Sequence, residues 1–187
     1  MRTQPAGHDV CSEAVRSVIR RGFHGYTPPA ANQPEVMAQF VRLVEEAGEL
    51  DAARRGMRNR TVIGSEIADV LIVASNLAWA VGFDPSALNV ARFDPLRDLW
   101  SLIADLARAL RKYTTDPRQI EEAILAIAAY CWCEASKHPI DVDLEDAIAY
   151  KLISDEMRGP LHGDQPAMPA MATIGRDGGG VNAPWAT

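Results

Sequence analysis

The chain has 187 residues, a net charge of −6 and a hydrophobic fraction of 48%, which suits one domain or two small halves that share a core. The acidic balance argues against nucleic acid or an anionic membrane as the main partner. No apolar stretch looks long enough to span a bilayer, and the N-terminus, with Asp9 and Glu13, lacks the apolar segment of a signal peptide. We therefore expect a cytoplasmic protein with no membrane partner and no stable nucleic-acid binding.

Residues 1–33 are expected to form a loose N-terminal segment with one short helix over 10–21 and a loop rich in glycine and proline over 22–32. The helix would carry Arg16, Arg20 and Arg21 on one side. These arginines are interpreted first as a solvated face, with a reach toward a substrate phosphate as the alternative. The three cysteines, Cys11, Cys131 and Cys133, lack CxxC spacing and are interpreted as reduced thiols of the core.

A second helix is predicted from Asn32-Gln33-Pro34, where a capping side chain precedes a proline suited to a first turn, to about Gly56. Its apolar residues share one face, which Glu46 and Glu49 flank. Gly48 lies beside these acids. It could leave room for a ligand or permit close helix packing, and the sequence leaves both open.

A basic turn over 56–64 and a third helix to Val81 are expected next, ended by Gly82-Phe83-Asp84-Pro85. Within the run 70–81 the polar members are Ser75 and Asn76, so this helix must be nearly all buried. Asn76 lies two turns after Asp69 on nearly the same line. It is a candidate for orienting a substrate phosphate or sugar hydroxyl, and the alternative is a satisfied core amide.

Two acidic pairs carry the functional signal: Glu46 with Glu49, and Glu66 with Asp69. Spacing of i,i+3 places both carboxylates of a pair on one helix face. Two such helices packed together would gather four carboxylates at the edge of a core, where they raise one another's pKa values. No Lys or Arg lies within either pair, and Mg2+ or Mn2+ selects hard oxygen ligands. The pattern therefore predicts a divalent metal site for a phosphate-bearing substrate, with two solvated helix faces as the alternative.

The sequences Glu45-Glu46-Ala47-Gly48-Glu49 and Glu66-Ile67-Ala68-Asp69, the second leading into a long apolar helix, resemble the MazG-type all-α nucleoside triphosphate pyrophosphohydrolases. The resemblance covers residues 34–84 well and the later part loosely. It implies an all-α helical bundle, assembled as a dimer or tetramer, that cleaves a nucleoside triphosphate to the monophosphate and pyrophosphate. Mg2+ or Mn2+ would be held by Glu46, Glu49, Glu66 and Asp69.

Within this resemblance, Glu45 or Glu49 would activate the attacking water, although Glu45 could equally be a surface acid. Relatives that remove non-standard nucleotides or adjust deoxynucleotide pools favour a deoxynucleotide substrate such as dGTP or dUTP. Two alternatives remain at this point: a hydrolase of another phosphoanhydride such as phosphoribosyl-ATP, and a non-catalytic helical interaction module.

An imperfect repeat follows residue 84, in which residues 102–110 echo 43–50 and residues 119–127 echo 65–73. In the echo Glu49 is matched by Arg108 and Asp69 by Leu125. The all-α domain over 34–162 would then consist of a catalytic half, 34–84, and a degenerate second half, 95–162. Ordinary similarity between amphipathic helices is the alternative.

A last helix is predicted over 144–157. Family members end their core with a Lys, a basic residue about two turns later and a Pro, and these cations contact phosphate; Lys151 and Arg158 match, while Asp155 stands where an Asn is common. Basic residues that complement a helix C-terminus are the alternative. Residues 163–187, rich in Gly, Pro and Ala, are expected to be a disordered tail.

Overall fold

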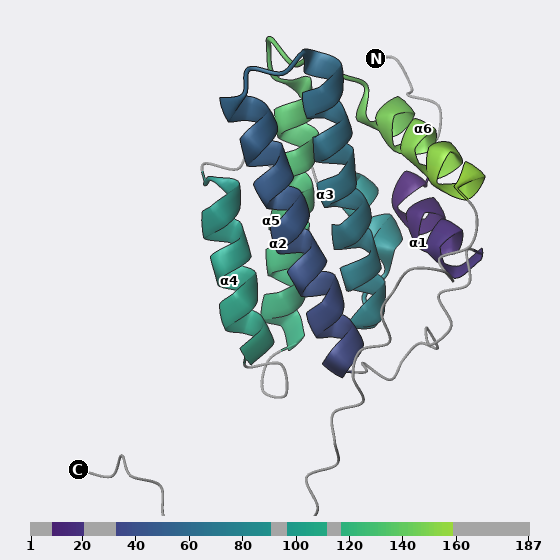
Figure 1. Cartoon of the computed structure of the whole chain (residues 1–187). Coiled ribbons are helices and arrows are strands. Elements are labelled where there is room, and N and C mark those ends of the chain that lie inside the picture. Colours follow the sequence, from purple (N-terminus) through teal and green to yellow (C-terminus); the bar gives the residue numbers. More distant parts are fainter. Residues whose placement is uncertain (1–8, 21–32, 91–96, 112–116, 159–187) are drawn as a thin grey trace, which may run out of the picture.

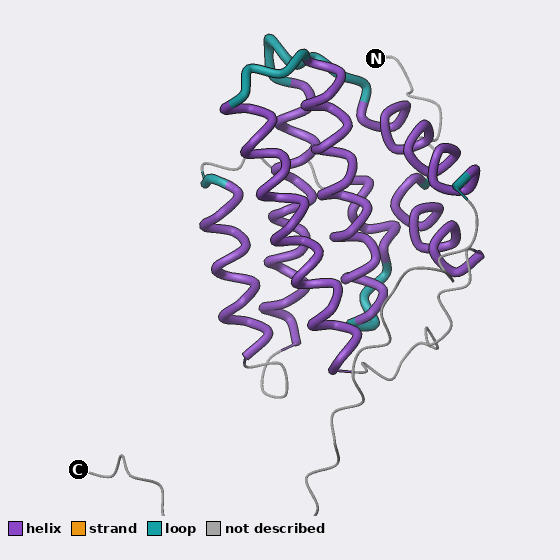
Figure 2. The backbone as a smooth tube through the Cα atoms, in the orientation of Figure 1, coloured by secondary structure: helices purple, strands orange, loops and turns teal. Residues whose placement is uncertain are grey.

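The computed structural model describes residues 9–20, 33–90, 97–111 and 117–158. Its elements are α1 (Val10–Arg20), α2 (Gln33–Arg55), α3 (Arg60–Ala80), the 3-10 helix η1 (Pro85–Val90), α4 (Leu99–Arg111), α5 (Pro117–Ser136) and α6 (Leu144–Met157). No strand occurs among these residues (Figure 2), so the all-α prediction is confirmed. The predicted loop 22–32, Arg21 and the tail 163–187 lie outside the described residues.

Helix α3 lies at the centre of the bundle, in contact with α2, α5, α6 and α1 (Figure 1). Its residues 67–68 and 70–78 are all buried, as the apolar run predicts. By length and composition α3 could cross a membrane, so the expectation that no stretch is long enough is wrong. In its most apolar window 67% of the residues are buried against the rest of the chain, and a helix that is apolar all round is also what the centre of a globular bundle requires.

Helix α3 begins earlier than the sequence suggests. The predicted turn over 56–64 is too long, because Asn59 caps the helix: its side-chain oxygen accepts a hydrogen bond from the Val62 amide at 3.0 Å. Gly64 therefore lies inside α3. A Cβ at this position would lie 2.7 Å from Cγ1 of Val142, so the glycine lets α3 approach the segment that leads into α6.

Gly48 is a different case. A Cβ built on it would meet no heavy atom within 4 Å. The close-packing interpretation of this glycine is therefore wrong, and its Cα faces open space.

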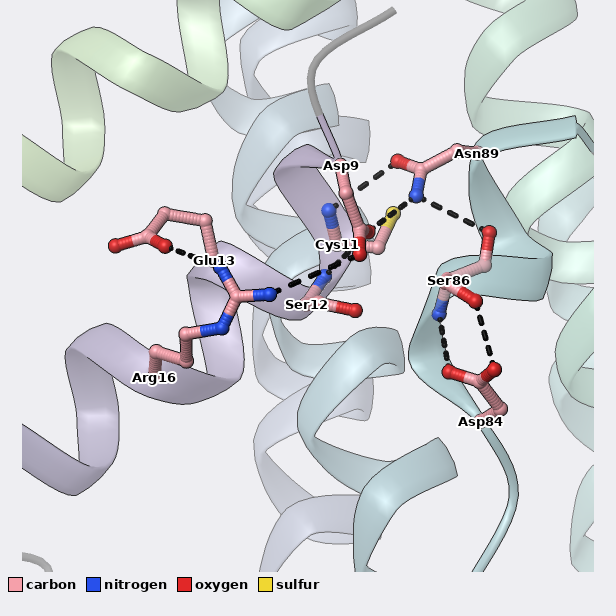
Figure 3. A network of polar contacts seen from close by, with 8 residues as sticks. All are labelled: Asp9, Cys11, Ser12, Glu13, Arg16, Asp84, Ser86 and Asn89. Carbon is pink, nitrogen blue, oxygen red and sulfur yellow. Dashed lines mark hydrogen bonds and ion pairs between the residues drawn. The ribbon is translucent and has the colours of Figure 1, made fainter.

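The side chain of Asn89 in η1 forms hydrogen bonds with the start of α1 (Figure 3). Its Oδ1 accepts from the Cys11 amide at 3.2 Å, and its Nδ2 donates to Oδ1 of Asp9 at 2.6 Å. Asp9 in turn caps α1 by accepting from the Ser12 amide at 3.1 Å. Arg16 pairs with Glu13 at 2.7 Å on the outer side of α1, which fits the solvated-face interpretation.

Helices α4 and α5 form a second hairpin beside the α2–α3 hairpin (Figure 1). Arg54 links the two: its Nη2 lies 2.9 Å from Oε1 of Glu134, and its Nη1 donates to the Tyr130 hydroxyl at 2.5 Å. The two echo segments thus lie in two neighbouring hairpins. That they are copies of one unit stays a prediction.

Candidate metal centre

Three carboxylates meet where α2 packs against α3. One oxygen each from Glu46, Glu66 and Asp69 lies within 4.8 Å of the others. All three side chains are half-buried. The grouping follows from the antiparallel α2–α3 hairpin (Figure 1), which sets the acidic turn of α2 against the acidic turn of α3. Three of the four predicted metal-ligating residues are therefore together.

The fourth acid, Glu49, is exposed and lies beside this cluster. Its charge raises the pKa of Glu46, Glu66 and Asp69, which places it within electrostatic reach of all three. Glu45 is exposed and is not part of the cluster. Of the two candidates for activating water, the structure brings Glu49 to the carboxylates.

Burial and mutual repulsion act on the cluster together. The pKa of Glu46 rises from its ordinary value of 4.5 to about 7, first because of burial and then because of Asp69 and Glu49. Burial is also the main cause that raises the pKa of Glu66, followed by the charge of Asp69. The carboxylates are thus held in a place where an added positive charge would be favourable.

Part of that charge comes from α6. The Lys151 ammonium forms an ion pair with Asp69, and its own pKa is raised by Asp69 and Glu66 against the opposing effect of burial. Lys151, predicted to contact phosphate, thus lies at the carboxylates. Arg158 does not reach the cluster; its side chain is 72% exposed, and its Nη1 lies 3.4 Å from Oδ1 of Asp155.

Sequence reasoning missed Arg42 and Gln39 near this site, and it named Asp155 without giving it a role there. Arg42 lowers the pKa of Glu46 and lies one turn before it, a spacing that could have identified it. Asp155 raises the pKa of Asp69, and its link to α3 depends on how α6 packs. Gln39 lies two turns before Glu46 on the same face, but glutamine is not a residue type that draws attention in an acidic motif.

Two buried amides lie on the same pair of helices. Gln39 and Asn76 are each 1% exposed. Oε1 of Gln39 and both Oδ1 and Nδ2 of Asn76 have no hydrogen-bond partner within the described part of the chain. A buried polar atom without a partner costs about 1–3 kcal/mol. Asn76 is therefore not the satisfied core amide that the sequence left open.

The oxygen cluster has the chemistry of a divalent cation site. Mg2+ and Mn2+ prefer carboxylate oxygens, and the half-buried Glu46, Glu66 and Asp69 offer them at close range. Lys151 offsets one of the three negative charges. The residues present therefore fit such an ion.

Comparisons of the chain with models of protein families, with curated proteins and with solved structures found no match. What the molecule defines by itself is a class: an all-α bundle with a carboxylate cluster between two of its helices.

Proposed function

We propose that the protein is a metal-dependent nucleoside triphosphate pyrophosphohydrolase, which converts a nucleoside triphosphate to the monophosphate and pyrophosphate. The observation that carries this proposal is the cluster of Glu46, Glu66 and Asp69 on the α2–α3 hairpin, with the Lys151 ammonium beside it. The type of reaction is inferred from the resemblance of the two acidic motifs to the MazG-type enzymes. A substrate rich in negative charge suits a site where bound cations and an ammonium meet.

In this proposal Glu46, Glu66 and Asp69 hold Mg2+ or Mn2+, and Glu49 completes the set from the exposed side. When bound, the ion neutralises phosphate oxygens and lowers the pKa of a water. Glu49 accepts a proton from the water as its oxygen bonds to the α-phosphorus. The bond from the α-phosphorus to the bridging oxygen breaks, and pyrophosphate leaves. Lys151, whose ammonium pairs with Asp69, would bind an oxygen of the polyphosphate.

We propose a deoxynucleotide such as dGTP or dUTP as the substrate, and a cytoplasmic dimer or tetramer as the working form. Exposed apolar side chains on α6 support the assembly. Tyr150, Ile153 and Met157 are 74%, 60% and 84% exposed and follow one another at helical spacing. Light scattering on the purified protein tests the assembly.

The experiment that tests the activity is incubation of the purified protein with each common ribo- and deoxyribonucleoside triphosphate in the presence of Mg2+. We expect pyrophosphate as the first product and complete loss of turnover with EDTA. Orthophosphate as the first product would contradict the cleavage position. A protein that neither binds Mn2+ in calorimetry nor turns over any triphosphate would be a non-catalytic module instead.

A further inference from the structure

The two unpartnered amides occupy one level of the α2–α3 hairpin. Gln39 precedes Glu46 by seven residues on α2, and Asn76 follows Asp69 by seven on α3. The two helices are antiparallel, and the oxygens of Glu46 and Asp69 lie within 4.8 Å of each other. Seven residues toward the start of α2 and seven toward the end of α3 therefore lead in the same direction, so both amides lie about 10 Å from the carboxylates along the α2–α3 interface. Seven residues are close to two helical turns, so each amide shares a line with its carboxylate.

The unmet hydrogen bonds define what could bind there. Oε1 of Gln39 and Oδ1 of Asn76 are acceptors and need a donor, while Nδ2 of Asn76 is a donor and needs an acceptor. A fully ionised phosphate offers acceptors alone, so it would leave both oxygens unmet. The edge of a nucleobase presents donors and acceptors side by side, and carboxamide side chains pair with such edges.

We propose that Gln39 and Asn76 form a nucleobase subsite two helical turns from the carboxylates, an inference that rests on the proposed function. In a nucleotide the sugar separates the phosphates from the base. With phosphates at Glu46 and Asp69, a nucleotide that runs along the α2–α3 interface would bring its base to the level of the amides. Both amides are 1% exposed, so a base reaches them by displacing neighbouring side chains into a site that excludes water.

This placement makes the subsite selective. A buried site built to hydrogen-bond one edge rejects an analogue that leaves its polar groups unmet, by far more than a hydrophobic pocket rejects a wrong shape. In this proposal Asn76 acts on the base, in place of the phosphate contact considered from the sequence. Gln39 is the second half of the same subsite.

The test uses Gln39→Met and Asn76→Leu, which retain approximate size and remove the hydrogen-bonding groups. Ser75→Ala is the control, because Ser75 is buried beside Asn76 but its hydroxyl already donates to the Leu71 carbonyl at 2.8 Å. The first readout is calorimetric binding of the common deoxynucleosides, without phosphate, to each full-length protein. The second is kcat/KM for the preferred triphosphate relative to the least preferred, with inorganic triphosphate as a competitive inhibitor.

We expect the wild type and Ser75→Ala to bind at least one deoxynucleoside, and each amide variant to bind it at least tenfold more weakly. The kcat/KM ratio should fall at least tenfold through KM, while inhibition by inorganic triphosphate is retained. The melting temperature of the unliganded variants should be retained or raised, because the substitutions remove buried polar atoms that lack partners. Equal deoxynucleoside binding by wild type and both amide variants, or a wild type that binds none, would overturn the subsite. A wild type that binds a deoxynucleoside but releases no pyrophosphate would contradict the proposed function and leave the base subsite standing.

Discussion

The two helical hairpins of this bundle have opposite chemistry at comparable positions. In α4–α5 the residues turned inward are apolar, with Leu102, Leu106, Ile124 and Ile127 among those buried. In α2–α3 the buried and half-buried seam holds Glu46, Glu66 and Asp69 together with Gln39 and Asn76. Both hairpins therefore supply apolar core, and the α2–α3 hairpin also carries polar groups that the fold alone leaves poorly compensated.

The same contrast holds for single positions in the echo. Counted at the offset that matches 65–73 to 119–127, Asp69 of α3 corresponds to Ala123 of α5, two residues before the Leu125 named from the sequence. Ala123 is buried in the core and Leu125 packs against it. Glu49 of α2 corresponds to Arg108 of α4, which pairs with Asp105. Glu46, Glu66 and Asp69 of the first hairpin lie close to one another. Asp105 of the second hairpin instead meets Arg97 and Arg108. We infer that metal binding is confined to the first hairpin.

The largest expected effect is on activity, and it tests whether metal binding is confined to the α2–α3 hairpin. Glu49→Gln and Asp69→Asn should each lower pyrophosphate release by at least about 100-fold, because each removes a charge that binds the ion or accepts a proton. The fold should persist in circular dichroism. Glu121→Gln and Glu122→Gln on α5 are the matched controls and should keep full turnover. Full activity in both Glu49→Gln and Asp69→Asn would contradict the mechanism, and loss in the α5 variants would place the site in the other hairpin.

The second effect concerns stability alone. Leu106 on α4 is 0% exposed, so Leu106→Ala should lower the free energy of unfolding by about 2–5 kcal/mol through a cavity. Urea unfolding measures this, and Mn2+ affinity of the folded fraction should stay unchanged. A Leu106→Ala protein of normal stability but weakened Mn2+ binding would show that metal binding is not confined to the α2–α3 hairpin.

The third effect separates two glycines of the first hairpin. Gly64→Ala should cost about 1–3 kcal/mol of unfolding free energy, because its Cβ would lie 2.7 Å from Cγ1 of Val142. Gly48→Ala should instead gain about 0.5–1 kcal/mol, because a helix prefers alanine and the position is open. Val142→Ala should restore part of the loss in Gly64→Ala. Equal effects of the two Gly→Ala changes would contradict the close approach at Gly64.

Much of the fold and of the carboxylate cluster is predictable from the sequence. The apolar run of α3, the bounds of α6 and the gathering of Glu46, Glu66 and Asp69 follow from helical periodicity and short-range spacing. The ion pair of Lys151 with Asp69 joins residues far apart in the chain, so spacing gives no sign of it. Its placement depends on the way α6 crosses α3.

Smaller errors have local causes. The sequence predicts too late a start for α3, because the basic, polar stretch before it resembles a turn and Asn59 acts as the helix cap. The pairing of Gln39 with Asn76 requires the register of the hairpin, which the sequence alone does not fix. The proximity of the Glu46 and Asp69 carboxylates in the structure defines this register, because it shows which turns of α2 and α3 face each other.

The smallest expected effect is the pH dependence of stability without metal, and it contrasts an acid from each hairpin. The pKa of Glu46 in the folded protein is raised from 4.5 to about 7. The folded state then holds more protons than the unfolded state between these values, so the stability from protonated Glu46 is present below pH 4.5 and is lost as the pH rises to about 7. Hydrogen bonds from Arg97 and Arg108 lower the pKa of Asp105 instead. Its contribution is present above its ordinary value of 3.8 and is lost as the pH falls through its lowered pKa.

In EDTA, the melting temperature of the wild type should therefore fall between about pH 5 and about pH 8, and that of Glu46→Gln should fall less. The effect should be modest, because Glu46 is half-buried and solvent screens its neighbours. Asp105→Asn should keep the slope of the wild type in this range, because Asp105 does not titrate there. Mg2+ should reduce the dependence of the wild-type melting temperature on pH, because the ion favours the charged carboxylates. Identical slopes for wild type and Glu46→Gln would show that Glu46 is not protonated in the metal-free fold, and that the repulsion within the cluster is relieved by other means.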